Sequence, residues 1–366
     1  MRTPRLAALL LWMVFCQPVA AQQLHARELT IPWKKAGSRG LDAILVYADL
    51  PGNRPLAVLT HGTSRIPKER SEVTAYSLLP QANWFARRGW TVLAVVRRGY
   101  GKSGGQPDYE NSRCPNTNYL EAGRESAEDL SRAIEYGAAL PGVDAAHVIA
   151  AGVSTGGFAT VALTAQAPPG LVAAISFAGG RGSRADFEIC NAGDLFDAFR
   201  DFGKHSRTPM LWVYAENYRY FWPALAHQFD QVFRAGGGLD QFVQVAATAA
   251  PGHGLFRRVD EWSSIVDDFL KTQNLVWLPE PLPAPKTPDD PPPPGLSEAG
   301  QRAFRNYLLA GPHKAFAMSE HRFAFSAAQV TLALARKKAL DSCRHSVPKG
   351  EKCVVVSADP AGSEEE

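Results

Sequence analysis

Ser154 has the sequence surroundings of a catalytic nucleophile. It is the central residue of Gly-Val-Ser-Thr-Gly at 152–156, with an apolar run before it and a helical pattern after it. This order predicts a strand, a sharp turn and a helix, with the serine held out of the sheet at the positive end of the helix. The alternative is a glycine-rich turn that needs small residues for packing alone, since the chain has 31 glycines.

Two further motifs follow apolar runs in the same way. His-Gly-Thr at 61–63 follows an early run, and Pro-Gly-His-Gly at 251–254 follows the last one. In this order and spacing, the motifs around Ser154 resemble those of the α/β-hydrolase superfamily. Arg-Gly-Tyr-Gly at 98–101 and the stretch 208–217 look like parts of exported dienelactone-hydrolase-like and prolyl-oligopeptidase-like serine hydrolases.

The resemblance implies a role for each motif. His253 is the general base that takes the proton of the Ser154 hydroxyl, reaching it from the loop after the final strand. The backbone amides of Thr63 and Thr155 are the two donors of the oxyanion hole. We expect His61 to fix the Thr63 loop by hydrogen bonding, so that it is not itself the base.

The acid of the triad is where the sequence departs from the resemblance. Similar hydrolases carry an aspartate at the position that Tyr218 occupies here. A tyrosine cannot stabilise a charged imidazole as a carboxylate does, and loss of the acid's charge can lower turnover by about 10⁴. Glu216 is the first candidate replacement, because an extended segment turns residues 216 and 218 to the same side. Asp186 is the second candidate, and a degenerate or absent acid is the remaining alternative.

The elements around these motifs predict an α/β fold with a doubly wound, mostly parallel sheet of the α/β-hydrolase type. Short apolar strands alternate with helices over residues 28–272, which is the part that the resemblance covers. Ligands of such sheets bind beyond the carboxyl ends of the strands. Residues 181–206 form either an insertion over the active-site face or an ordinary crossover helix. The expected strands are 28–33, 41–47, 56–60, 90–96, 147–153, 171–177, 208–214 and 242–246, and the expected helices are 76–88, 126–140, 155–166, 222–235 and 261–272.

Composition and charge narrow the class of protein. The chain has 366 residues, of which 45% are hydrophobic and 20% charged, as in a globular protein with a large core. A net charge of +3 without a Lys/Arg block among aromatic residues argues against a nucleic-acid partner. Residues 1–21 read as a secretory signal peptide, which predicts a secreted or periplasmic protein. The apolar run is far shorter than the ~20 residues that span a bilayer, so we expect no membrane insertion after cleavage.

The number and positions of the cysteines are consistent with an exported protein. Of the five, Cys16 lies in the signal peptide, and the remaining four can form two disulfides in an oxidising compartment. The local choice pairs Cys114 with Cys190 and Cys343 with Cys353, on either side of a proline-rich segment. Four buried free thiols are the alternative. No Cys-x-x-Cys or histidine-rich spacing indicates a metal site, and the predicted chemistry needs no cofactor.

A proline-rich segment divides the chain. Nine of the residues 279–295 are prolines, which predicts an extended linker after a hydrolase domain at 22–278. A small α+β module follows at 296–360, and residues 361–366 form an acidic tail. The module's expected elements are helices at 297–309 and 326–342, the second with a capping box at Ser326 and Gln329, and strands at 314–318, 321–325 and 353–357.

The sequence thus predicts an exported serine hydrolase that cleaves an ester, and less readily a peptide bond, of a small-molecule or peptide substrate. An acyl-enzyme on Ser154 is the expected intermediate. A hydrolase-fold binding protein with impaired catalysis is one alternative, for which Tyr218 argues. An acyltransferase is another, because it uses the same acyl-enzyme and excludes water from the second step. Dienelactone hydrolysis is not carried over, since those enzymes use a cysteine as nucleophile.

Overall fold

The structure, a computed structural model, describes residues 23–247, 251–345, 347 and 351–360. The predicted signal peptide at 1–21 and the acidic tail at 361–366 lie outside these residues. None of the helices described is both long and apolar enough to pass through a bilayer.

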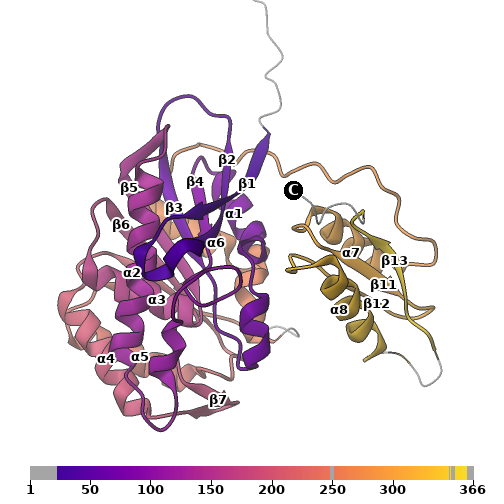
Figure 1. The fold of residues 1–366 in the computed structure, drawn as a ribbon. Helices are drawn as coiled ribbons and strands as arrows, with labels where there is room; N and C mark the ends of the chain where they lie inside the picture. The colour runs from indigo at the N-terminus through magenta and orange to yellow at the C-terminus, as the bar shows by residue number, and fades with distance from the viewer. Residues whose placement is uncertain (1–22, 248–250, 346, 348–350, 361–366) are drawn as a thin grey trace, which may run out of the picture.

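An eight-stranded sheet, ordered β1-β2-β4-β3-β5-β6-β9-β10, runs through the larger part of the chain (Figure 1). β2 is antiparallel to both of its neighbours, and all other neighbours are parallel. The central strands are apolar runs buried on both faces, as in a sheet covered by helices on both sides. This confirms the predicted fold class. The strands are β1 (Leu24–Ile31), β2 (Leu41–Ala48), β3 (Arg54–Thr60), β4 (Thr91–Val95), β5 (Val143–Val153), β6 (Leu171–Phe177), β9 (Met210–Ala215) and β10 (Asp240–Val245).

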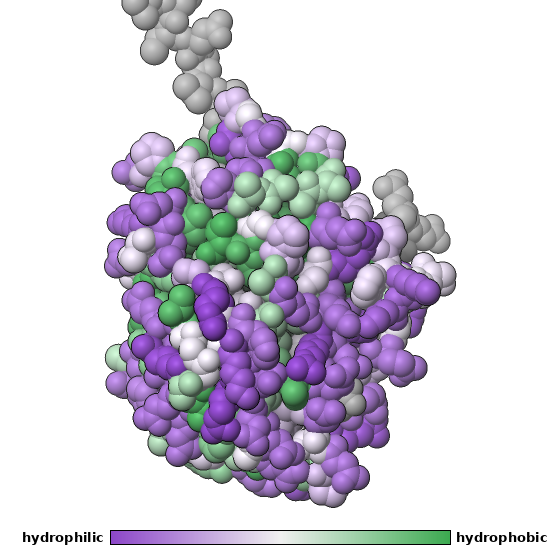
Figure 2. Space-filling view, turned by 90° about the vertical axis from the view of Figure 1, so that its left-hand side faces the viewer, coloured by the Kyte–Doolittle hydropathy of each residue, from purple (hydrophilic) through white to green (hydrophobic). Residues whose placement is uncertain are grey.

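Helices cover both faces of this sheet. On one face, α1 (Leu79–Ala86) and α6 (Val259–Thr272) contact each other, with the rings of Trp84 and Trp262 edge to face at 5.0 Å. A row of four helices covers the other face: α2 (Tyr119–Ala138), α3 (Thr155–Gln166), α4 (Ala192–His205) and α5 (Pro223–Ala235). Short 3-10 helices lie in the connections: η1 (Lys34–Arg39), η2 (Pro67–Glu72), η3 (Ala75–Leu78), η4 (Asp108–Ser112) and η5 (Gly252–Arg257). Seen from the left-hand side of Figure 1, the surface is mostly hydrophilic, with hydrophobic side chains gathered in its upper half (Figure 2).

Residues 181–206 combine both of the predicted arrangements. They begin with a hairpin of β7 (Ser183–Ala185) and β8 (Glu188–Ile189), and α4 then returns through the helical layer as an ordinary crossover. Cys190, at the end of the hairpin, is disulfide-bonded to Cys114 in the loop before α2. This is the pairing that the sequence predicts.

The C-terminal module is a second, smaller sheet with a helix on each face. Residues 279–295 lead to it as an extended arc (Figure 1). Ala335 and Ala339 pack on one face, and Phe304 and Tyr307 pack against Phe316 on the other. The sheet order is β12-β11-β13, with β11 (Ala315–Met318), β12 (Phe323–Ser326) and β13 (Val354–Ala358), and the helices are α7 (Glu298–Leu309) and α8 (Leu332–Arg344).

Two sequence predictions for the module have different outcomes. Cys343 and Cys353 form a disulfide, as predicted. The capping box at Ser326 is wrong, because Ser326 pairs with β11 as the last residue of β12. Thr331 caps α8 instead, where its side chain accepts a hydrogen bond at 3.2 Å from the amide of Leu334. Pairing of the strand therefore overrides the local capping signal.

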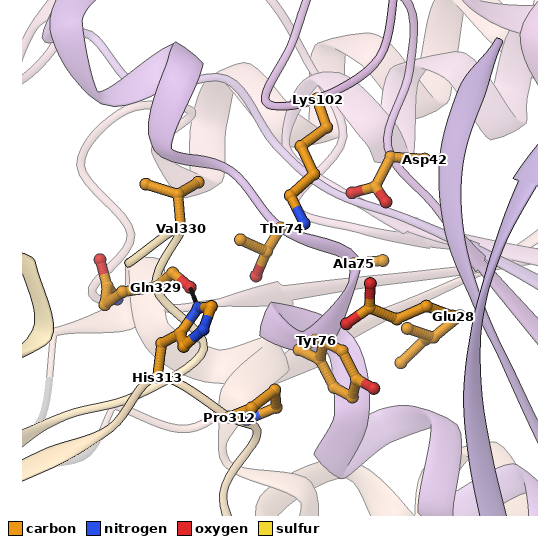
Figure 3. A pocket seen from close by; sticks show the side chains of 11 residues that line it. Glu28, Asp42, Thr74, Ala75, Tyr76, Lys102, Pro312, His313, Gln329 and Val330 are labelled. Atoms are coloured by element: carbon orange, nitrogen blue, oxygen red, sulfur yellow. Dashed lines mark hydrogen bonds between the residues drawn. The ribbon is translucent and has the colours of Figure 1, made fainter. Parts of the chain in front are cut away.

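The module contacts the larger part of the chain beside η2 and η3. The Thr74 hydroxyl donates to the carbonyl of Ala328 at 2.7 Å, and Lys338 pairs with Glu72 at 2.7 Å. A cavity of about 30 Å³ lies in this interface, with Lys102 on one side and His313 on the other (Figure 3). The cavity has room for a water molecule and not for a substrate.

Substitution of Phe316 tests how the module is held together. Phe316→Ala removes a ring that is fully buried between α7 and the sheet, and we expect the local opening free energy of β11 to fall by about 3–5 kcal/mol. Amide hydrogen exchange of β11 and α7 measures this change. Phe325→Ala is the control, because that ring is 38% exposed and its loss should have a much smaller effect. Equal effects of the two variants would contradict the proposed core.

Candidate active site

Ser154 lies at a strained turn between β5 and α3. Its backbone has φ 57° and ψ −118°, values that a residue with a side chain rarely adopts. The Ser154 amide donates to the carbonyl of Phe177 at 2.9 Å, and its carbonyl accepts from the amide of Gly180 at 3.1 Å. The turn therefore holds the serine at the carboxyl edge of the sheet, at the N-terminus of α3.

The glycines of the motif are required by close backbone contacts. A Cβ atom on Gly152 would lie 2.3 Å from the carbonyl oxygen of Gly156, and one on Gly156 would lie 2.4 Å from that of His61. A Cβ atom on Gly62 would lie 3.0 Å from the Cβ of Ser154. The loop after β3 is thus packed directly against the serine, which is the place that an oxyanion loop occupies.

His61 fixes this loop, as the sequence predicts. Its Nε2 accepts from the amide of Arg97 at 3.1 Å, and its Nδ1 donates to the carbonyl of Gly62 at 2.7 Å. Burial and the nearby Arg97 guanidinium lower the pKa of His61 to about 3, so the ring is neutral at pH 7. Because Nε2 accepts from an amide and Nδ1 faces a carbonyl oxygen, the ring proton lies on Nδ1. Both nitrogens are therefore engaged, and His61 is not free to act as a base.

The two threonines predicted to supply the oxyanion donors lie side by side. Thr155 is the first residue of α3, so its amide has no acceptor within the helix. Its hydroxyl lies 2.7 Å from that of Thr63, which lies 2.5 Å from the hydroxyl of Tyr100, and Tyr100 donates to Asp108 at 2.8 Å. Because an ionised carboxylate only accepts, the hydroxyl protons must run from Thr155 through Thr63 and Tyr100 to Asp108. These hydroxyl protons are thus engaged within the network, and the backbone amides are the groups that the prediction assigns to a ligand oxygen.

A buried cluster of charged side chains supports these threonines. The carboxylate of Asp108 accepts from Nε of Arg97 at 3.0 Å and from Arg181 at 2.8 Å, and all three side chains are at most 1% exposed. Arg97 also donates to the Thr155 hydroxyl at 3.0 Å. Burial raises the pKa of Asp108, but Arg181 and Arg97 outweigh this and hold it well below its usual range. Sequence reasoning missed this cluster, whose one local signal is an arginine directly after a buried strand.

His253 lies in η5, which packs beside the turn after β9. Its Nδ1 is 3.3 Å from the hydroxyl of Tyr218, and the two rings are parallel within 5°. Tyr220 packs on the imidazole at 4.5 Å, and the guanidinium of Arg65 stacks on Tyr220 at 3.7 Å. His253 is nevertheless an exposed residue. Desolvation, Arg257 and Arg65 together lower the pKa of His253 to about 4, so it is neutral at pH 7.

The hydroxyl of Tyr218 contacts both the proposed nucleophile and the proposed base. The phenol is 1% exposed, its hydroxyl contacts His253, and a polar interaction with the Ser154 side chain acts to lower its pKa. Burial raises the pKa of Tyr218 above its ordinary value, so the hydroxyl keeps its proton. No hydrogen bond joins Ser154 directly to His253 in the part of the chain that the structure describes.

Neither acidic candidate is brought to His253. The segment after β9 is not extended as the Glu216 prediction assumes, because the chain turns and the Tyr218 amide donates to the carbonyl of Ala215 at 3.1 Å. Glu216 therefore points outward and accepts from the amide of Ala247 at 3.1 Å. Asp186 lies in the β7–β8 turn, where it pairs with Arg65 at 3.4 Å and with an arginine at 219 at 3.5 Å. Within the described residues, His253 has no carboxylate as a hydrogen-bond partner.

Among the described residues, no group of three or more histidine, cysteine, aspartate or glutamate side chains is arranged to hold a metal. The oxygen and nitrogen atoms around Ser154 are instead engaged with one another, from Thr155 through to Asp108. This arrangement suits nucleophilic attack on a carbonyl group whose oxygen enters between two backbone amides.

The α/β-hydrolases carry a serine at a strained strand-to-helix turn, in the middle of a mostly parallel sheet whose second strand is antiparallel. Ser154 and β2 show the same arrangement. The chain has the fold of that superfamily. The sequence model of one of its families, described as X-Pro dipeptidyl-peptidase (S15 family), matches residues 43–201. The match includes Ser154 and ends before His253. No curated protein sequence matches the chain.

Several solved structures are similar to this chain. An esterase from Thermogutta terrifontis with bound propionate is 17% identical over 70% of this chain and 97% of that one, with a TM-score of 0.49. A dienelactone hydrolase-like promiscuous phosphotriesterase from metagenomic libraries is 16% identical over 68% and 98%, with a TM-score of 0.48. An esterase from Pyrococcus furiosus is 14% identical over 69% and 93%, with a TM-score of 0.46. The sheet order and the turn at Ser154, and not these likenesses, carry the fold assignment.

Replacement of Asp108 tests the buried cluster. Asp108→Asn leaves two buried arginines without a counter-charge, and we expect the free energy of unfolding to fall by about 3–5 kcal/mol. Urea unfolding followed by tryptophan fluorescence measures the change. Asp197→Asn is the matched control, because Asp197 is 74% exposed and pairs with Arg200 on the surface of α4. An Asp108 variant as stable as this control would show that the cluster does not hold the edge of the sheet together.

Proposed function

We propose that the protein is an exported serine hydrolase that cleaves esters of small molecules through an acyl-enzyme on Ser154. The observation that carries this proposal is the strained turn that places Ser154 directly against the loop of Gly62 and Thr63. The backbone strain is maintained by close glycine contacts, and strain of this kind concentrates at functional sites. The amides of Thr63 and Thr155 are the proposed donors to the oxyanion, and His253 is the proposed base.

An ester suits this site better than a peptide bond. The base is a neutral imidazole that has no carboxylate beside it, and Arg65 and Arg257 oppose the positive charge that it would gain. An amine leaving group must be protonated before it departs, whereas a phenol or acidic alcohol leaves as the anion. The peptidase activity named in the description of the S15 family is therefore not carried over to this chain.

A binding protein with the hydrolase fold is the second candidate. The absence of a carboxylate partner for His253 among the described residues favours it, because the imidazolium lacks the charge that normally stabilises it. Oxyanion stabilisation and substrate binding alone still accelerate acyl transfer by about 10³–10⁴ over water. Slow turnover therefore separates the first candidate from the second, and complete absence of acylation would favour the second.

Export to an oxidising compartment is part of the proposal. The sequence supports it through the predicted signal peptide at 1–21, and the two disulfides fit it. Both bonds join cysteines whose sequence positions suggested the pairing, so the chain is suited to a secreted or periplasmic location. The proposed substrate is a small-molecule ester, with no role for nucleic acid.

Acylation of Ser154 is the direct test. A fluorophosphonate probe should label the mature protein, and Ser154→Ala should abolish the label because its hydroxyl forms the covalent bond. Ser71→Ala is the control, since Ser71 is an exposed serine in η2 and its loss should leave labelling unchanged. Labelling is read by gel fluorescence, and mass spectrometry of the tryptic peptide locates it. Equal labelling of Ser154→Ala, or none of the wild type, would refute the proposal.

The pH dependence of labelling tests the base. Because only neutral His253 accepts a proton and its pKa is about 4, the rate should stay level from pH 7 to about 5 and fall as the pH passes below 4. Arg257→Gln removes a charge that opposes protonation and should move this inflection upward, towards the ordinary histidine value. Arg27→Gln, on the exposed side of β1, is the control. Circular dichroism at each pH excludes unfolding, and a wild-type inflection near 6.5 would contradict the described environment of His253.

A further inference from the structure

Tyr218 stands where related hydrolases carry an acid, but its contacts differ from those of an acid. A triad carboxylate contacts only the histidine, whereas the Tyr218 hydroxyl lies 3.3 Å from Nδ1 of His253 and also interacts with the Ser154 side chain. The phenol therefore connects the nucleophile to the base. The inference drawn from this contact rests on the proposed function, because it concerns how Ser154 loses its proton.

Close packing fixes the position of the phenol. The turn after β9 directs the residue back over the sheet edge, with its amide bonded to the carbonyl of Ala215. The segment that carries His253 packs directly on this turn, since a Cβ atom on Gly252 would lie 2.8 Å from the Tyr218 nitrogen. The ring is enclosed by Phe221 at 5.7 Å and Tyr220 at 5.5 Å. Its hydroxyl has little freedom to leave the two polar partners.

The protonation states allow one order of hydrogen bonds through the phenol. Burial keeps Tyr218 protonated, and desolvation with two nearby arginines keeps His253 neutral. A neutral imidazole with its proton on Nε2 accepts at Nδ1, so the phenol donates there. The remaining lone pair of the phenol oxygen then accepts from the Ser154 hydroxyl. Each hydroxyl thus donates toward the imidazole.

We infer that Tyr218 relays the proton of Ser154 to His253. As Oγ of Ser154 forms its bond to the substrate carbonyl carbon, its proton passes to the Tyr218 oxygen, and the phenolic proton passes to Nδ1 of His253. The carbonyl π electron pair moves to the oxygen that faces the amides of Thr63 and Thr155. The phenol is neutral before and after the step, and the positive charge resides on the imidazole.

The same path runs in reverse when the leaving group departs. The oxyanion electron pair re-forms the carbonyl, the ester C–O bond breaks, and the imidazolium returns its proton through Tyr218 to the leaving oxygen or to solvent. Water then takes the place of the alcohol, loses a proton through the same hydroxyl to His253 and attacks the acyl carbon. The resulting oxyanion re-forms the carbonyl as the bond between the acyl carbon and Oγ of Ser154 breaks, and the imidazolium returns its proton through Tyr218 to Oγ, which frees the carboxylic acid. The step consumes only the ester and water and needs no other reactant.

Removal of the phenolic hydroxyl tests the relay. Tyr218→Phe keeps the ring and its packing but breaks both hydrogen bonds, and we expect the fluorophosphonate labelling rate and kcat for p-nitrophenyl acetate to fall by about 10² or more. KM should change little, because the phenol is not a substrate-binding group. Tyr214→Phe is the control: that hydroxyl is also buried on the same stretch of chain, but it donates to the carbonyl of Gly179 at 2.6 Å. Labelling of this control should stay within about threefold of the wild type.

A proton inventory on the unmodified protein gives a second readout that does not depend on a variant. Two protons move together in the relay, so kcat/KM measured in mixtures of H₂O and D₂O should curve with the deuterium fraction. Direct transfer from Ser154 to His253 moves one proton and gives a straight line. A merely structural role for Tyr218 would leave the inventory linear, whatever its effect on stability.

The outcomes separate the relay from the proposed function. A large loss in Tyr218→Phe together with a curved inventory supports the relay. A labelled wild type whose inventory is linear, or a folded Tyr218→Phe variant within about threefold of the wild-type rate, overturns the relay and leaves the serine hydrolase intact. Failure of the wild type to label at Ser154 refutes the proposed function itself.

Discussion

The carboxylate of Asp108 is the group on which the active-site edge depends. It is fully buried and binds Arg97 just after β4 and Arg181 just after β6, and it also accepts from Ser126 of α2. These segments leave the sheet from different strands, so one pair of oxygen atoms sets their relative positions. A buried ion pair need not add net stability, since desolvation offsets much of the attraction. Its importance is geometric, because either arginine without the carboxylate would be a buried, unpaired charge.

This cluster also determines which groups can meet a substrate. The hydroxyl protons of Thr155 and Thr63 are drawn toward Asp108 through Tyr100, so the backbone amides, and not the side chains, are left as donors. Such fixed donors need no reorganisation as the oxyanion forms, which is why they contribute strongly to acyl transfer. The proposed base is less favourably placed, since His253 would gain its charge near Arg257 and Arg65, and no carboxylate of the described residues is its hydrogen-bond partner. In the proposed mechanism, oxyanion stabilisation is therefore strong and proton abstraction is weak.

How far the sequence could predict this arrangement depends on whether each feature is local. The turn at Ser154 and the position of His253 follow from short motifs placed after apolar strands. Glu216 illustrates the opposite case, because its proposed role required an extended segment and the chain turns after β9. The bond between Asp108 and Arg181 joins residues 73 positions apart, and no spacing rule connects them. Local signals predicted Ser154 as the candidate nucleophile, whereas the charges around it and the contacts of Tyr218 could be found only in the folded chain.

The disulfide between Cys114 and Cys190 joins two segments near the carboxyl edge of the sheet. It closes a loop of 76 residues and thereby restricts the unfolded chain, and it ties the β7–β8 hairpin to the loop before α2. The hydroxyl of Tyr119, at the start of α2, donates to the Cys190 carbonyl at 2.6 Å and holds the same junction. Asp186 at the hairpin turn pairs with Arg65. The guanidinium of Arg65 stacks on Tyr220, which packs on the imidazole of His253. A disulfide that joins these segments is compatible with a secreted or periplasmic location, where the surroundings are oxidising.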